Sequence, residues 1–170
     1  SYDHQSKRIN LLQQIKVHAN DWAYCIHPIQ KDNDSRIGVV LGASLGVWEY
    51  RQKSGYQFTG WSVREDQREV GHIRGKIKRP HISAIAPLPD QENALIYTCF
   101  ETKGGDGPVR IVDLQTGERT FDAYEHRGRS WSVAALSRHV FATGADDALV
   151  KIWDSRQGPH SVHTLAKDVG

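Results

Sequence analysis

Three residues in the last third of the chain have side chains that can transfer a proton or attack an electrophile. His126 and Asp147 could form an acid–base dyad, and Thr143 could supply a hydroxyl nucleophile. Thr143 lies inside an apolar run, however, so we expect its hydroxyl to point into a packed sheet and not toward a cleft. The same side chains, joined by the indole N–H of Trp153, could instead satisfy one another as a buried polar network.

The segment that carries these residues predicts short strands joined by tight turns. β-favouring residues run from Trp131 to Ala135, then over 140–142, and then over 150–153. The acidic pair Asp146-Asp147 between the last two runs is typical of a turn. Together with a preceding strand, this gives one four-stranded antiparallel unit.

Residues 119–156 resemble a WD repeat. The ending Trp153-Asp154 is similar to the end of the third strand in that family, and His126, Thr143, Asp147 and Trp153 are similar to its structural tetrad. The resemblance implies an all-β fold, a β-propeller of four-stranded antiparallel blades, because one such blade cannot bury both of its faces alone. It also implies that the tetrad stabilises the blade and is not catalytic.

Two weaker copies of the repeat precede this one. The pair Val112-Asp113 stands 41 residues before Trp153-Asp154, which is close to the period of about 40–45 residues expected for these repeats. Val112 replaces the tryptophan in this copy, and a further copy ends near Trp48. We therefore predict the following segments: blade-like repeats at about 10–51, 64–114 and 119–156, and the outer strand of a following blade at 160–170.

On this interpretation residues 1–170 are a propeller portion of about three to four blades, belonging to a ring that commonly has seven in the family. The first and last residues are then expected to be cuts in a longer chain, with a half-ring completed by a second chain as the alternative. The two cysteines, Cys25 and Cys99, lie in apolar runs without metal-ligand spacing and predict buried reduced thiols in the cytoplasm or nucleus.

Composition argues against several classes of function. A formal net charge of +2 gives no global attraction to nucleic acid or to a membrane surface. No run of about 18 apolar residues could span a bilayer. Of the histidines, only His160 and His163 fall close together, so neither a metal nor another cofactor is expected.

Asp154 and Arg156 are candidate partner-binding residues. They complete a Trp-Asp-x-Arg ending that is similar to the box of WD-repeat substrate receptors in cullin-type ubiquitin ligases. An arginine at the propeller rim can present its planar fork to an acidic surface. The alternative is that Arg156 only pairs with Asp154 in its own blade.

A basic cluster is a second candidate for partner binding. It could contact phosphates or an acidic protein, or simply be a solvated part of a charged loop between residues 64 and 80. Its members are Arg74, Lys76, Lys78 and Arg79.

We therefore predict a non-catalytic scaffold that binds other proteins, with a cullin ligase adaptor and a peptide or protein substrate as hypothetical partners. Two alternatives remain open at this stage. One is a scaffold of an RNA-processing or trafficking complex, and the other is a propeller enzyme whose active site lies outside this segment.

Overall fold

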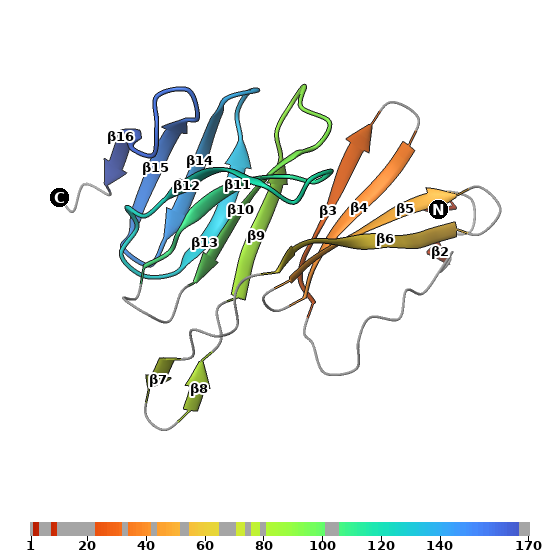
Figure 1. The fold of residues 1–170 in the computed structure, drawn as a ribbon, viewed down its shortest axis with the longest axis horizontal. Coiled ribbons are helices and arrows are strands. Elements are labelled where there is room, and N and C mark those ends of the chain that lie inside the picture. The colour runs from red at the N-terminus through yellow and green to blue at the C-terminus, as the bar shows by residue number, and fades with distance from the viewer. Residues whose placement is uncertain are drawn as a thin grey trace.

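Every regular element that the structure describes is a β-strand (Figure 1). The computed structural model describes residues 2–3, 8–9, 23–31, 34–41, 44–51, 55–64, 71–73, 76–78, 81–100 and 106–166. In those ranges there is no helix that could cross a membrane. The prediction of an all-β fold is confirmed.

Three four-stranded antiparallel sheets make up most of the fold. The first sheet contains β3 (Ala23–Lys31), β4 (Asp34–Leu41), β5 (Ser44–Arg51) and β6 (Gly55–Arg64). The second contains β9 (His81–Pro87), β10 (Ala94–Phe100), β11 (Val109–Asp113) and β12 (Arg119–Ala123). The third contains β13 (Ser130–Ala135), β14 (Val140–Ala145), β15 (Leu149–Asp154) and β16 (Ser161–Ala166). Two short hairpins, β1 (Tyr2–Asp3) with β2 (Arg8–Ile9) and β7 (Gly71–Ile73) with β8 (Lys76–Lys78), complete the described strands.

The three sheets lie side by side, and their first strands in chain order, β3, β9 and β13, are neighbours. In each sheet the strands follow chain order, and β9 contacts both β3 and β13 (Figure 1). A succession of antiparallel meanders joined through their first strands is the arrangement of propeller blades. The predicted fold class, a β-propeller of four-stranded blades, is therefore present, with three blades in the described residues.

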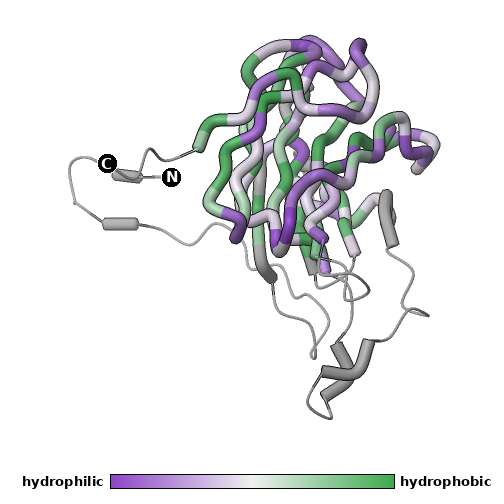
Figure 2. Tube along the Cα trace, turned by 90° about the vertical axis from the view of Figure 1, so that its left-hand side faces the viewer, coloured by the Kyte–Doolittle hydropathy of each residue, from purple (hydrophilic) through white to green (hydrophobic). Residues whose placement is uncertain are grey.

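The middle sheet is apolar on both faces because it packs against a neighbour on each side. Along β10, Leu95, Tyr97 and Cys99 join a core with the first sheet, whereas Ile96 joins a core with the third. This is the alternation of period two expected for a strand. The hydropathy colouring of Figure 2 shows apolar segments along the packed strands and hydrophilic ones in many of the turns.

Aromatic side chains fill the core between the second and third sheets. Phe141 is stacked on Trp153 with ring centroids 6.2 Å apart, and Phe121 meets Phe141 edge to face at 5.6 Å. Phe141 and Trp153 are fully buried. Offset stacks and edge-to-face pairs are the favourable arrangements of such rings, so this core fixes how the two blades sit together.

A glycine allows the second and third sheets to approach closely at one edge. A Cβ atom on Gly107 would lie 2.3 Å from the carbonyl oxygen of Gly128, which no side chain can tolerate. The Ser130 hydroxyl donates to the Gly107 carbonyl at 2.8 Å, and the Thr98 hydroxyl donates to the Ser130 carbonyl at 3.2 Å. These bonds join β10 and the start of β13 across the interface.

Two details of the predicted organisation are wrong. Residues 161–166 pair with β15, so this strand closes the third sheet and does not belong to a following blade. In each of the three four-stranded sheets the fourth strand in chain order pairs with the third and closes the sheet. The predicted charged loop at 64–80 also contains the β7–β8 hairpin.

The two faces of the third sheet differ in burial, and this difference gives a first testable prediction. Phe141 on the inner face is fully buried, whereas Val150 on the outer face is 41% exposed. We expect Phe141→Ala to lower the free energy of unfolding by about 3–5 kcal/mol, because it opens a cavity between two blades. The matched change Val150→Ala should cost less than about 1 kcal/mol. Urea denaturation followed by tryptophan fluorescence measures both, and equal losses would contradict the assignment of the two faces.

Candidate functional site

Four predicted residues come together as one hydrogen-bonded chain inside the third sheet. The Trp153 indole N–H donates to the Thr143 hydroxyl at 2.8 Å, and that hydroxyl lies 2.8 Å from Nε2 of His126. On the other side of the ring, Nδ1 lies 2.9 Å from Oδ2 of Asp147. In a neutral ring Nδ1–H donates to the carboxylate, so Nε2 accepts from the hydroxyl.

Asp147 also holds the backbone of two loops. Its carboxylate accepts the N–H of Arg127 at 3.0 Å and that of Leu149 at 3.1 Å. Partial burial by itself would raise the pKa of Asp147, but the hydrogen bond with His126 and the two backbone N–H groups outweigh burial and lower it. The carboxylate therefore stays ionised as the fixed end of the network.

This network lacks the features of a catalytic dyad. His126 and Thr143 are 1% and 2% exposed, and Thr143 is already bonded on both sides. A nucleophile needs access to substrate and a base with free capacity. The geometry supports a structural role for all four residues.

Asp154 and Arg156 lie at the opposite end of β15 from Asp147. The guanidinium of Arg156 donates from Nε to Oδ1 at 2.9 Å and from Nη2 to Oδ2 at 2.6 Å of Asp154. This hydrogen bonding lowers the pKa of Asp154 well below its usual range and raises that of Arg156. The Asp154 side chain is 6% exposed and that of Arg156 is 63% exposed, so a buried carboxylate holds an accessible cation in one orientation.

Glu125 joins the outer strand of the third sheet to the loop before β13. It accepts from the Ser161 hydroxyl at 2.6 Å and from Lys151 Nζ at 3.2 Å, and it lies 3.0 Å from Nδ1 of His160. Burial alone would raise the pKa of Glu125, but the bonds from Ser161, His160 and Lys151 lower it to about 2. The sequence interpretation missed this cluster, because its members are far apart in the chain.

The sequence interpretation also missed a contact between Arg129, just before β13, and the exposed Trp131 of that strand. Arg129 lies over the ring of Trp131, with Cζ 4.3 Å from the centroid. Arg129 precedes the strand and a β-bulge lies between Ser130 and Ser132, so the period-two alternation of a strand could not have placed the two side chains together. Trp131 was interpreted only as a strand former, yet it is 53% exposed.

The basic cluster is not placed as a site. Lys76 and Lys78 lie on β8, and Arg74 and Arg79 lie outside the described residues. Within the ranges that the structure describes, no group of three or more His, Cys, Asp or Glu side chains could hold a metal ion. Cys25 and Cys99 are free thiols, and Cys99 is buried.

Comparison with known proteins gives partial matches. No family model matches the chain. Protein SPA1-RELATED 3 of Arabidopsis thaliana is 32% identical over 68 residues, 39% of this chain and 8% of that protein. DDB1- and CUL4-associated factor 5 of Homo sapiens is 36% identical over 59 residues, 34% of this chain and 6% of that protein. A guanine nucleotide-binding protein subunit beta of Oryza sativa subsp. indica is 32% identical over 91 residues, 49% of this chain and 23% of that protein.

Solved structures match over a larger part of the chain. The Dos1 propeller superposes on 86% of it with a TM-score of 0.59 at 10% identity, which covers 35% of the Dos1 chain. A chain of the mitotic checkpoint complex superposes on 92% with a TM-score of 0.57 at 15% identity, which covers 46% of that chain. The matched relatives are WD-repeat proteins, and these structural neighbours are propellers. The chain has a β-propeller fold, and its sequence is similar to segments of WD-repeat proteins. It spans less than a quarter of the length of the curated relatives named above.

Corresponding positions in the three blades face the same way. Trp153 packs against the second sheet, and Val112 packs against the first. Trp48 contacts Val39 on the face of the first sheet that is turned away from the second. The repeats are therefore related by rotation, even where Val112 replaces the tryptophan.

Removing one hydroxyl tests the buried network. Thr143→Val keeps the volume but leaves the indole N–H and a nitrogen of His126 without a partner. We expect a loss of about 1–3 kcal/mol in the free energy of unfolding. Thr120 is exposed on β12, and Thr120→Val should change stability by no more than about 0.5 kcal/mol. Indistinguishable urea midpoints for the two variants would disprove the network's contribution.

Acid unfolding tests the Glu125 cluster. Because the folded pKa of Glu125 is lowered from 4.5 to about 2, the folded state holds fewer protons than the unfolded state between these values. Its contribution to stability is complete above pH about 4.5 and is lost as the pH falls toward about 2. The difference in unfolding free energy between the wild type and Glu125→Gln should shrink over this range. Glu118 is exposed, so Glu118→Gln is the control, and a difference for Glu125→Gln that does not vary with pH would contradict the assignment.

Proposed function

We propose that this chain is an interaction scaffold and serves as the substrate-recognition part of a cullin-type ubiquitin ligase, docking to the ligase adaptor through Arg156. The observation that carries the proposal is the bidentate pair in which buried Asp154 fixes an exposed Arg156 at the end of β15. The likeness to DDB1- and CUL4-associated factor 5 supports the same adaptor class.

The structure fixes the orientation of the Arg156 side chain before a partner binds. A free surface arginine loses side-chain entropy when a partner immobilises it, whereas the Arg156 guanidinium is already held by two charge-assisted hydrogen bonds to Asp154. One edge of its guanidinium faces Asp154, and the exposed remainder can donate to acceptors of a partner. Arginines of this kind are frequent energetic anchors of protein interfaces.

The surroundings of Arg156 are also rigid. The Ser155 N–H donates to the His139 carbonyl at 3.0 Å, which connects the end of β15 to the β13–β14 turn. The Gln157 N–H donates to the Asp154 carbonyl at 2.9 Å. Because this turn is hydrogen-bonded at both positions, the Arg156 backbone has a fixed position relative to the blade.

The test is binding of purified DDB1 to the purified protein by biolayer interferometry. We expect Arg156→Ala to weaken binding roughly tenfold or more, and Arg156→Lys to weaken it too, because an ammonium cannot present a planar fork. Asp154→Asn removes the charge that holds Arg156 and should have an intermediate effect. Arg138 is exposed in the β13–β14 turn at the same end of the sheet, and Arg138→Ala is the matched control. Equal binding by wild type and Arg156→Ala, or no binding by wild type, would overturn the proposal.

A further inference from the structure

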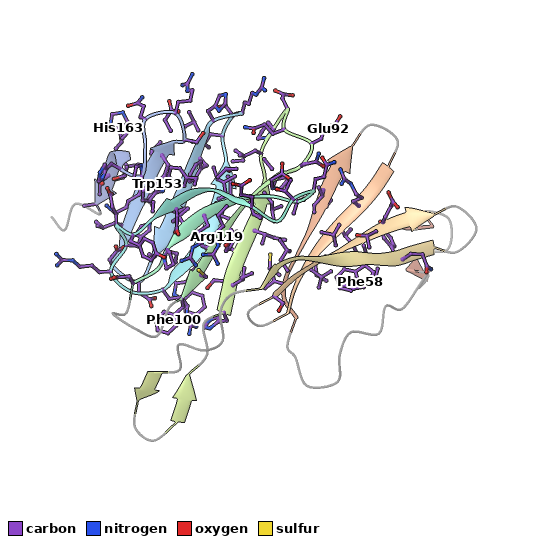
Figure 3. The ribbon with its side chains drawn as sticks, in the orientation of Figure 1. Phe58, Glu92, Phe100, Arg119, Trp153 and His163 are labelled. Atoms are coloured by element: carbon purple, nitrogen blue, oxygen red, sulfur yellow. The ribbon has the colours of Figure 1, made fainter. Side chains whose placement is uncertain are left out.

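An aromatic and cationic cluster lies at the end of the sheets opposite Arg156. The Arg129 guanidinium lies between two rings, 4.3 Å from the Trp131 centroid and 5.0 Å from the Phe100 centroid. Phe100 ends β10 and Trp131 begins β13, so the cluster spans the second and third blades at their inner strands. Figure 3 shows Phe100 at the other end of the sheets from Glu92, which lies in the β9–β10 turn.

Asp146 holds this cluster in place. Its carboxylate accepts the Trp131 indole N–H on Oδ1 and the Arg129 backbone N–H on Oδ2 at 3.3 Å. The Asp146 N–H in turn donates to the Arg129 carbonyl at 3.0 Å. Both oxygens of Asp146 are thus occupied by neutral donors, which fix the indole and the backbone at Arg129, while the guanidinium is held by its contacts with the two rings.

The guanidinium of Arg129 retains its capacity to bind an anion. No carboxylate of the described residues forms an ion pair with it, in contrast to Arg110 and Arg156. Stacking on aromatic faces occupies the plane of the group and leaves its N–H edge free to donate. Beside it, Trp131 leaves 53% of its surface in solvent, a large apolar area for one residue.

We propose that Arg129, Trp131 and Phe100 form a binding site for an acidic peptide segment of a partner protein, with a carboxylate on the Arg129 fork and an apolar side chain on the Trp131 ring. Tryptophan and arginine are the residue types that most often dominate binding energy at interfaces. Preorganisation by Asp146 removes part of the entropic cost of binding.

A protein carboxylate fits this surface better than a nucleic acid does. The surrounding loops place Asp106, Asp146 and Asp147 near the two arginines Arg127 and Arg129. A phosphate backbone needs a row of cations, and the carboxylates interspersed between these two arginines do not provide one. A single peptide carboxylate needs only one guanidinium, which Arg129 supplies.

This inference rests on the proposed scaffold function and specifies the surface that would bind the substrate. The start of β13 and the end of β15 are opposite ends of one sheet. A segment bound at Arg129 therefore leaves Arg156 accessible, and each site can be removed without the other.

The experiment selects dodecapeptides from a random phage-displayed library on the immobilised protein. We expect the enriched peptides to share an Asp or Glu next to an apolar residue. By fluorescence anisotropy, a synthetic enriched peptide should lose roughly tenfold or more in affinity for Arg129→Gln, and should lose affinity for Arg129→Lys as well. The same peptide with Gln in place of its shared acid should bind the wild type equally weakly, a readout that needs no protein variant. Arg138→Gln is the matched control and should bind normally.

Three results would overturn the inference: no enrichment, enriched peptides without a shared acid, or equal binding by wild type and Arg129→Gln. Binding of a labelled poly-uridine oligonucleotide that depends on Arg129 would also overturn it, in favour of nucleic acid. Arg156→Ala separates this site from the adaptor site, because it should keep full peptide affinity. A wild-type protein that binds the peptide but not the adaptor would therefore overturn the proposed ligase role alone.

Discussion

The third blade depends on the two hydrogen bonds that the Thr143 hydroxyl makes. The hydroxyl lies between the Trp153 indole and the His126 ring, with its oxygen 2.8 Å from a nitrogen of each, and Thr143 is only 2% exposed, so solvent does not replace either partner. In a buried site an unmatched donor or acceptor costs more than a hydrogen bond contributes. The network therefore permits only the arrangement in which the loop before β13, strand β14, the following turn and β15 are all in register.

That constraint also sets where the exposed groups lie. Asp147 ties the backbone of Arg127 and Leu149 to the network, so both loops at this end of the sheet have fixed positions. Asp146 is the residue before Asp147, and it holds Trp131 and the Arg129 backbone. At the far end of β15, Trp153 is followed directly by Asp154, which orients Arg156. A buried structural chain thus positions one candidate surface at each end of the same blade.

Sequence reasoning predicted the fold well because the relevant signals are local. His126, Thr143, Asp147 and Trp153 lie within one repeat, and each strand around them follows period-two alternation. The assignment of residues 160–170 failed because sequence shows a strand but not which neighbour it pairs with. The Arg129 cluster could not be predicted in full, since Phe100 comes from another blade and reaches Arg129 only through the packing of two sheets.

Hydrogen exchange at the indole N–H groups, followed by NMR, tests the central claim most directly, since the protein carries its own internal comparison. Trp153 and Trp131 both donate to a side chain, but Trp153 is fully buried and Trp131 is 53% exposed. Our account predicts that the Trp153 indole proton exchanges only by unfolding of the blade, with a protection matching its most stable backbone amides, whereas that of Trp131 exchanges rapidly. Equally rapid exchange of both protons would show that the buried network does not hold the blade together.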